Sequence, residues 1–225
     1  MARQGKKYLA DLAKAPQQSL PLAEAVKAVK AFRDTKFDQS IEVVLHLGID
    51  PKQSDQALRG AVALPHGVGA TKRVIAFVSA DKVAKAKAAG AVEAGADDLV
   101  AKIEAGWLDF DVVIAEPAMM RVVAKLGKQL GPKGLMPSPK AGTVTPQIEQ
   151  AVKEYAAGKV EFRNDAGGNV AAAVAKKSFS AEMIADNARA FIQHIEKLKP
   201  ATVKGQYIKR VAIAASMTPS VTIAL

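Results

Sequence analysis

Residues 74–89 read Val-Ile-Ala-Phe-Val-Ser-Ala-Asp-Lys-Val-Ala-Lys-Ala-Lys-Ala-Ala and decide the fold class of the middle of this chain. The five apolar residues 74–78 predict a buried strand. After two small residues, Asp81 is expected to cap a helix over residues 82–89. A strand that runs directly into a helix indicates the first half of a strand–helix–strand unit.

The same pattern returns further along the chain. Residues 112–115, Val-Val-Ile-Ala, predict a second buried strand, and a further helix is expected to begin at Pro146. Short buried strands that alternate with helices are typical of a parallel sheet with crossover helices. Residues 73–158 are therefore expected to form an α/β block.

Both ends of the chain have a different pattern. Residues 41–47, 160–163 and 205–216 are rich in β-branched residues or alternate in polarity, which indicates antiparallel strands. Two amphipathic helices accompany them, one in the N-terminal part and one that follows an expected Ser180 cap. The apolar faces of these helices are Leu22, Val26, Val29 and Phe32 in the first, and Ile184, Phe191, Ile192, Ile195 and Leu198 in the second.

The simplest architecture is an α/β protein of two domains. Residues 1–67 and 160–225 are expected to form a discontinuous α+β outer domain, with residues 68–159 as an inserted α/β inner domain. Gly67-Val68-Gly69 and Gly158-Lys159 are the expected crossings between them, because glycine accepts the backbone torsions that a domain junction needs.

The charge balance points to an acidic partner. The chain carries 32 Lys and Arg against 22 Asp and Glu, a formal charge of +10, and the outer domain holds +7 of it. With no Cys there is no disulfide framework or thiolate metal site, and a cytoplasmic location is expected. No stretch has the composition of a signal peptide or the roughly 20 apolar residues of a membrane span.

Candidate catalytic groups are few. His46, His66 and His194 are far apart and lack the spacing of metal ligands, and no cofactor or catalytic residue is expected. The strongest enzyme alternative is a nucleotide-binding α/β enzyme that uses the glycines of residues 127–134. Their spacing fits neither a Walker loop nor a dinucleotide fingerprint, and the stretch follows a helix-like segment instead of a strand.

The segment around these glycines is nonetheless unusual. Residues 127–146 hold four Gly and four Pro, and residues 117–148 contain five basic side chains and no acidic one. A rigid, positively charged loop can contact RNA directly or can simply cover one end of the sheet. Both alternatives remain open on composition alone.

RNA binding by the outer domain has the stronger physical basis, since basic side chains on an open sheet neutralise phosphates while an aromatic ring stacks on a base. Lys36 and Phe37 precede an expected strand, where Phe37 is either a stacking residue or part of the core. Arg163, Lys176 and Lys177 lie on or beside strands of the same domain, where they either point at RNA or form an ordinary solvated face.

Residues 216–220, Ser-Met-Thr-Pro-Ser, interrupt the last β-rich run. Small hydroxyl side chains permit a close approach of the backbone to a partner, and a bend at the edge of a sheet explains them equally well.

Ordered motifs along nearly the whole chain resemble the ribosomal protein L1 family of the large subunit, bacterial type. The most specific motif is residues 126–144, which include Gly131, Lys133, Gly134 and Lys140. The other matching motifs are Lys36-Phe37-Asp38, Leu47-Gly48-Ile49-Asp50-Pro51, Leu64-Pro65-His66-Gly67, Gly106-Trp107-Leu108-Asp109-Phe110-Asp111 and Gly158-Lys159-Val160-Glu161-Phe162-Arg163-Asn164-Asp165.

The resemblance implies the same two domains, with the inserted inner domain Rossmann-like, and it implies a function. It implies a structural constituent of the large ribosomal subunit that binds the ribosomal RNA stalk near the tRNA exit site. It also implies binding to the protein's own messenger RNA, repression of its translation, contact with exit-site tRNA, and a cytoplasmic monomer when off the ribosome.

By position, the resemblance places RNA contacts at Lys36, Phe37, Ser40 and Glu42, and in the tail at Ser216, Met217 and Thr218. The family usually has glycine at position 218, His at 171 and Gly at 175, where this chain has Thr218, Ala171 and Ala175. Threonine restores the steric limit that glycine lacks, so Thr218→Gly is expected to tighten RNA binding or leave it unchanged.

Overall fold

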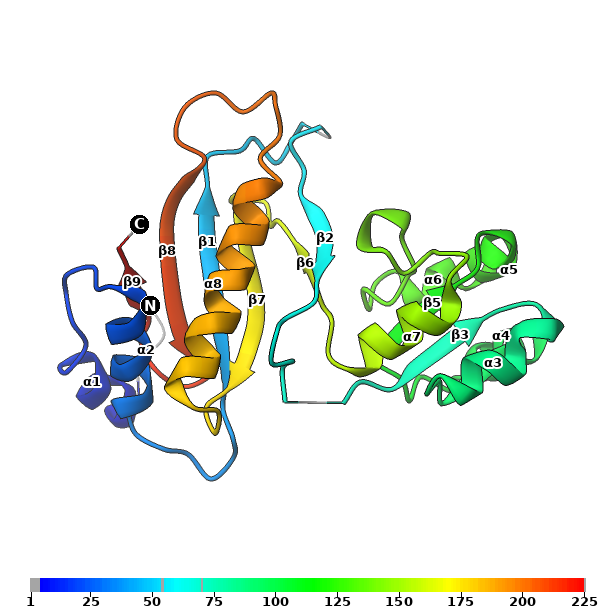
Figure 1. Cartoon of the computed structure of the whole chain (residues 1–225), viewed down its shortest axis with the longest axis horizontal. Coiled ribbons are helices and arrows are strands. Elements are labelled where there is room, and N and C mark those ends of the chain that lie inside the picture. Colours follow the sequence, from blue (N-terminus) through cyan, green and yellow to red (C-terminus); the bar gives the residue numbers. More distant parts are fainter. Residues whose placement is uncertain (1–4, 54, 70, 225) are drawn as a thin grey trace. The chain divides into compact units, whose positions relative to one another are not determined.

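The computed structural model describes residues 5–53, 55–69 and 71–224. Its contacts divide the chain into two compact units. Unit 1 comprises residues 1–69 and 160–225, and unit 2 comprises residues 70–159. The chain crosses between the units after Gly69 and after Lys159. The fold is mixed α/β, as predicted (Figure 1).

Unit 1 contains an antiparallel sheet of four strands in the order β7-β1-β8-β9, with β1 in the middle of the three long strands. Helices α2 and α8 pack together on one face of this sheet, and Figure 1 shows α8 lying across it. The helices of unit 1 and the strands of this sheet are α1 (Lys6–Leu12), α2 (Leu22–Ala31), β1 (Ser40–Leu47), β7 (Asn169–Lys176), α8 (Ala181–Lys197), β8 (Ile208–Ala215) and β9 (Val221–Ile223).

The sequence explains this layer directly. Along β1 every second side chain is buried, so Ile41, Val43 and Leu45 face the helices. Helix α8 begins after Ser180, whose hydroxyl accepts a hydrogen bond from the Met183 N–H, as predicted. Of its predicted apolar face, Ile184, Phe191 and Ile195 are buried. Ile192 is partly buried and packs against the same core, whereas Leu198 lies just after the helix and is 39% exposed, so the prediction was wrong for Leu198 alone.

A second, two-stranded sheet completes unit 1. Strands β2 (Arg59–Val62) and β6 (Val160–Arg163) pair antiparallel, with Arg59 opposite Arg163. Phe162 of β6 packs edge-on against Phe191 of α8, which joins this small sheet to the same core.

Unit 2 is a parallel α/β layer structure. Its strands run in the order β4-β3-β5, and residue 144 extends the sheet by a parallel bridge to Ala115. All side chains of β3 and β5 are buried, as expected for parallel strands covered on both faces. The elements are β3 (Val74–Phe77), α3 (Val83–Ala88), β4 (Glu93–Gly95), α4 (Asp97–Glu104), β5 (Val112–Ala115), α5 (Met120–Val123), α6 (Gly127–Leu130), α7 (Ile148–Ala156) and four short 3₁₀ turns at Ala80–Lys82, Pro117–Met119, Ala124–Leu126 and Pro139–Ala141.

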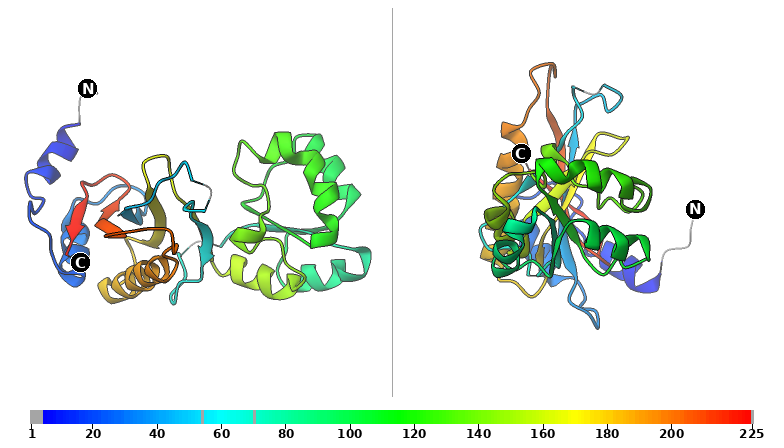
Figure 2. Two further views of the ribbon diagram at one scale, coloured as in Figure 1. Left: turned by 90° about the horizontal axis from the view of Figure 1, so that it is seen from above. Right: turned by 90° about the vertical axis from the view of Figure 1, so that its right-hand side faces the viewer.

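The helices of unit 2 form two layers around this sheet (Figure 2). Helices α3 and α7 contact each other, and α7 packs on β3 and β5. Ile75 and Phe77 of β3 point the other way, into a cluster with residues of α4, α5 and α6. The predicted Rossmann-like layering is therefore present in this unit.

Two local predictions in unit 2 were wrong. The expected helix after β3 starts as a 3₁₀ turn at Ala80, and Asp81 makes no capping bond to its N–H groups. The helix expected from Pro146 begins two residues later at Ile148. Both differences arise at helix starts, where alternative turns satisfy the free N–H groups about equally well.

Candidate nucleic-acid interface

The loop that leads into β1 exposes a large aromatic side chain. Residues 32–39 connect α2 to β1 without regular structure. Within this loop Lys36 is exposed and Phe37 is 51% exposed. An aromatic ring with half of its surface in solvent contributes little to the core, so the core alternative for Phe37 is wrong. The ring is available for contact with a partner.

The turn between β8 and β9 exposes a second large side chain. Met217 is 60% exposed, the highest value among the large apolar side chains of the described residues. Ser216 beside it is also exposed. The amide of Met217 donates a hydrogen bond of 3.1 Å to the side-chain oxygen of Gln39, at the end of the Phe37 loop. The two exposed apolar residues, 180 positions apart in sequence, are thus tied to one short segment.

Hydrogen bonds join the polar predicted residues at the same end of the sheet. Ser40 donates from its N–H to the Ser216 hydroxyl at 3.2 Å, and the Ser216 N–H donates to the Ser40 carbonyl at 3.1 Å. The Lys176 ammonium donates to the Ser40 hydroxyl at 2.8 Å. Strands β7, β1 and β8 therefore bring Lys176, Ser40 and Ser216 side by side.

Glu42 lies on the sheet face opposite to the helices. It is exposed, and in the strand register it stands between Ala173 of β7 and Ala214 of β8. Ala171, at a position where the resembling family usually has His, is also exposed on this face, while Ala175 is fully buried. The open face around Glu42 is therefore lined by small side chains, which let a partner approach the sheet closely.

We call Lys36, Phe37, Ser40, Glu42, Lys176, Ser216 and Met217 together the β1 surface. It combines two large apolar side chains with two ammonium groups at one end of an open sheet. This combination matches what single-stranded or looped RNA presents, namely exposed base faces beside phosphates.

Thr218 belongs to the turn but its side chain faces inward. It is 8% exposed, and its hydroxyl accepts a 3.0 Å hydrogen bond from the Ala215 N–H. No described non-glycine residue has a positive φ, so Thr218 has an ordinary backbone conformation. Any contact of position 218 with a partner therefore falls to its main chain.

Arg163 lies in another part of unit 1. Arg163 is exposed at the end of β6 in the two-stranded sheet, and its neighbour Asn164 bridges to Val170 at the start of β7. Lys176 is six residues further along that strand, about 20 Å away at 3.3 Å per residue. The fold thus separates Arg163 from the β1 surface.

For Lys177 the sequence left two alternatives, contact with RNA or a solvated face, and the structure shows neither of them. The residue is 9% exposed, and its ammonium donates to the carbonyl oxygens of Phe32 and Arg33 and to the carboxylate of Asp34. The hydrogen bond from Lys177 holds the pKa of Asp34 below its usual value. The alternation of buried and exposed side chains breaks down at the end of β7, and the next residue, Lys177, turns inward beneath the loop of residues 32–39.

Sequence reasoning missed Gln39 altogether. This side chain is 1% exposed and bridges the Arg33 carbonyl, at 3.4 Å, and the Met217 amide. A single Gln in a polar loop carries no periodic or motif signal, so only the structure reveals it.

The predicted residues of unit 2 lie in a separate loop, residues 127–142. Gly134 has φ +72°, and a Cβ at Gly131 would come within 2.6 Å of the Gly127 carbonyl oxygen, so this loop requires glycine at both positions. Lys133 and Lys140 are exposed. At the end of the loop, the hydroxyl of the next residue, Thr143, accepts a hydrogen bond from the Ser138 N–H at 2.8 Å.

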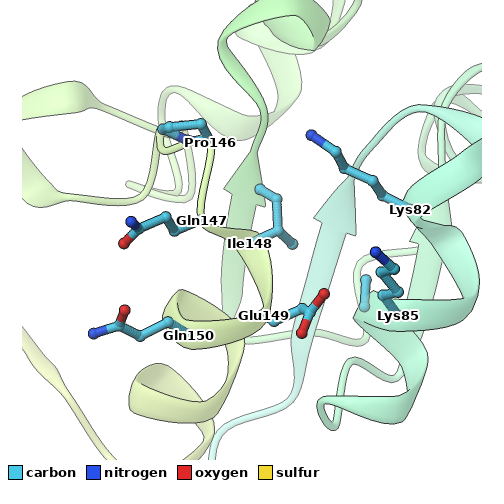
Figure 3. A pocket seen from close by; sticks show the side chains of 8 residues that line it. Lys82, Lys85, Pro146, Gln147, Ile148, Glu149 and Gln150 are labelled. Atoms are coloured by element: carbon cyan, nitrogen blue, oxygen red, sulfur yellow. The ribbon is translucent and has the colours of Figure 1, made fainter.

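The pocket shown in Figure 3 tests the nucleotide alternative. It has a volume of about 290 Å³ and lies between the starts of α3 and α7, with Lys82, Lys85 and Glu149 around it. No residue of the 127–142 loop lines it. Lys82 is paired with Glu116 at 2.6 Å, which lowers the pKa of that carboxyl. The glycine-rich loop and the pocket are thus separate features.

The described residues hold no cluster of His, Cys, Asp and Glu suited to a metal ion. Within the same ranges, no helix combines the length and the apolar character of a membrane span.

These features define a two-unit α/β protein with a candidate nucleic-acid interface, in which an exposed aromatic side chain lies beside basic residues. Comparison with known proteins gives the family. The model of the ribosomal protein L1p/L10e family matches residues 29–219. The large ribosomal subunit protein uL1 of Rhodopirellula baltica is 54% identical over 224 residues, covering 100% of both chains.

The chain belongs to the ribosomal protein L1 family, as the motifs predicted. It is accordingly a cytoplasmic, ribosome-associated structural protein and not an enzyme, so the nucleotide-enzyme alternative is excluded.

Proposed function

We propose that unit 1 binds ribosomal RNA of the large subunit through the β1 surface. The observation that carries this proposal is the pair of exposed apolar side chains, Phe37 and Met217, beside Lys36 and Lys176. Stacking on a base and pairing with phosphates need these two kinds of group within reach of one nucleotide segment.

The charge of the chain supports the same unit. With the predicted bounds, residues 1–67 and 160–225 carry 19 basic and 12 acidic side chains, against 13 and 10 in residues 68–159. The excess in the outer segments favours an approach of RNA to unit 1.

The relative from Rhodopirellula baltica is named for the large ribosomal subunit. We propose that the present chain is likewise a structural constituent of that subunit and binds its RNA stalk near the tRNA exit site. Exit-site tRNA is proposed as a neighbour, and the free protein is proposed to be a monomer.

The same surface provides a route to regulation. A hairpin of the protein's own messenger RNA that resembles the stalk would occupy the β1 surface in place of ribosomal RNA. Binding of this hairpin would repress translation, and the two RNAs would compete.

A titration tests the proposal. The full chain is added to a fluorescent stalk hairpin and to a scrambled hairpin of the same length, at one salt concentration. Tight binding to the stalk alone is expected, and unlabelled messenger hairpin is expected to displace it. Equal affinity for both hairpins would leave only charge-driven binding and contradict the proposal.

A further inference from the structure

Buried polar groups lie directly beneath the β1 surface and bind the loop that carries Phe37. The loop has eight residues and contains no helix or strand, yet its two ends, Phe32 and Gln39, are both buried. An exposed loop without regular structure normally samples several conformations. The groups that hold this loop in one conformation therefore affect how readily Phe37 can bind a partner.

Lys177 uses its whole hydrogen-bonding capacity on the loop. An ammonium group has three N–H donors. These donate to the Phe32 carbonyl at 2.7 Å, the Arg33 carbonyl at 3.3 Å and the Asp34 carboxylate at 2.7 Å. Burial of an ammonium is tolerated only with such a complete set of partners, so the position of the loop and the position of Lys177 depend on each other.

Gln39 joins the loop to the Met217 turn. Its amide nitrogen donates to the Arg33 carbonyl at 3.4 Å, and its side-chain oxygen accepts from the Met217 N–H. Its own carbonyl accepts from the Lys177 N–H at 2.8 Å. Gln39 is thus bonded to the loop, to the turn and to the strand end that carries Lys177.

Further bonds fix the loop on its outer side. Asp38 accepts from the N–H of Ser178 at 3.1 Å and from its hydroxyl at 2.7 Å, and the Thr35 hydroxyl donates to the Phe37 carbonyl at 2.7 Å. The Asp38 side chain and the Phe37 carbonyl are thus held by hydrogen bonds, while the Phe37 ring stays half exposed.

We propose that Lys177 and Gln39 are positioning residues of the RNA-binding surface. They hold the Phe37 loop and the Met217 turn in one arrangement before RNA arrives, so that little conformational entropy is lost on binding. The inference rests on the proposed function, because it assigns these buried groups an effect on affinity that they exert through Phe37 and Met217.

The test uses the full chain and a stalk hairpin, with binding followed by fluorescence anisotropy. Lys177→Met keeps the length of the side chain and removes the ammonium. We expect it to weaken binding about tenfold, the cost of ordering a loop and a large side chain on binding. In a Phe37→Ala background the same change is expected to weaken binding less than about twofold, because the residue through which Lys177 acts is gone.

Lys30→Met is the matched control. The Lys30 ammonium donates to the carbonyl of Phe179, close to Lys177 in sequence, instead of to the loop. This variant loses the same charge from the same region, and its affinity is expected to stay within about twofold of the wild type. An equal loss in Lys30→Met would show that net charge, and not loop position, explains the effect.

Gln39→Met provides a second variant should Lys177→Met fail to fold. It removes the bonds to Arg33 and Met217, and about a fivefold loss is expected. The loss should vanish in the double variant Phe37→Ala with Met217→Ala.

Two results separate the possible failures. If Phe37→Ala weakens binding but Lys177→Met and Gln39→Met do not, the positioning inference is overturned and the proposed function stands. The same conclusion follows if Lys177→Met and Gln39→Met weaken binding by the same factor with and without Phe37→Ala. If Phe37→Ala has no effect, the proposed surface is wrong and the inference fails with it.

Discussion

The β1 surface of unit 1 and the 127–142 loop of unit 2 are both basic, but they differ in what accompanies the charge. The β1 surface exposes Phe37 and Met217, whereas the 127–142 loop exposes Lys133 and Lys140 and none of its large apolar side chains is among the exposed ones. Charge alone attracts any phosphate chain, and an exposed ring adds contact with bases. The comparison suggests that sequence-dependent binding belongs to unit 1.

The two regions are also fixed in different ways. The 127–142 loop is shaped by proline and by glycines that no other residue can replace without strain, as at Gly134. The Phe37 loop is held by side chains that come from elsewhere in the chain, chiefly Lys177 and Gln39. A loop fixed by local sequence can be recognised in a motif, while a loop fixed by distant side chains cannot.

The largest expected effect is that of Phe37→Ala on RNA affinity. Loss of one stacked base costs about 1–3 kcal/mol, or roughly fivefold to more than a hundredfold in affinity. Because the ring is half exposed, the thermal midpoint of unfolding should stay nearly constant. A titration measures the affinity and a thermal melt of the same sample measures the midpoint. A lowered midpoint with unchanged affinity would show that Phe37 serves the fold and that the β1 surface does not differ from the 127–142 loop by a stacking residue.

Thr218→Gly should act on stability instead of affinity. The change removes the hydroxyl bond to the Ala215 N–H and frees the backbone of the turn, which is expected to cost about 1–2 kcal/mol of unfolding free energy. Since the side chain faces inward, the structure gives no steric reason for tighter RNA binding, unlike the expectation from sequence. Urea unfolding measures the change in stability, and a titration with RNA at one salt concentration measures the change in affinity. Tighter binding of Thr218→Gly would support the sequence-based expectation that the threonine side chain hinders RNA sterically.

Salt dependence sharpens the comparison between the two basic regions. Lys36→Ala should reduce the slope of the logarithm of affinity against the logarithm of salt by about one. Lys133→Ala in the 127–142 loop is the matched control, with the same charge removed, and its slope should equal that of the wild type. Equal flattening by both variants would place the loop of unit 2 in contact with RNA.

The smallest expected effect is the response to acid. Asp81, Asp111, Glu116 and Glu154 of unit 2 have lowered pKa values, caused mainly by hydrogen bonds to Ser79, Arg73, Lys82 and Lys159 respectively. A lowered pKa in the folded state stabilises the fold above the unfolded pKa of about 4, and this contribution is lost as pH falls through the folded values. Unit 2 is thus expected to lose stability below about pH 4.

Trp107 makes this loss measurable, because the chain has one Trp and it lies in unit 2, packed against Phe110. Its fluorescence should report unfolding at a lower temperature near pH 3 than at neutral pH. Glu116→Gln is the control and should reduce the difference in unfolding temperature between pH 3 and neutral pH. If acid lowers the unfolding temperature equally with and without the Glu116 carboxylate, the ion pair between Glu116 and Lys82 contributes nothing measurable to stability.

Much of the fold could be read from the sequence. The buried run at 74–78, the alternation along β1 and the Ser180 cap each predict their element, because strand period and helix capping act between near neighbours. Helix starts were less accurate, as at Asp81 and Ile148, since several turns can serve the same free N–H groups.

The β1 surface was only partly predictable. Lys36, Ser40 and Met217 came from the motifs, and the exposure of Phe37 was an open alternative until the structure showed the ring in solvent. Whether a side chain at the end of a strand points outward depends on neighbours that are remote in sequence, and hydrophobicity alone does not contain that information.

By itself, the sequence determined the α/β class, the two kinds of strand pattern, the basic charge and the family motifs, all of which are local or additive properties of the chain. Tertiary structure alone decided that Lys177 turns inward, that Thr218 bonds its own turn, and that Gln39 ties Arg33 to Met217. These contacts join segments more than a hundred residues apart in two of the three cases. Their energies depend on burial, which exists only once the sheet and helices have packed.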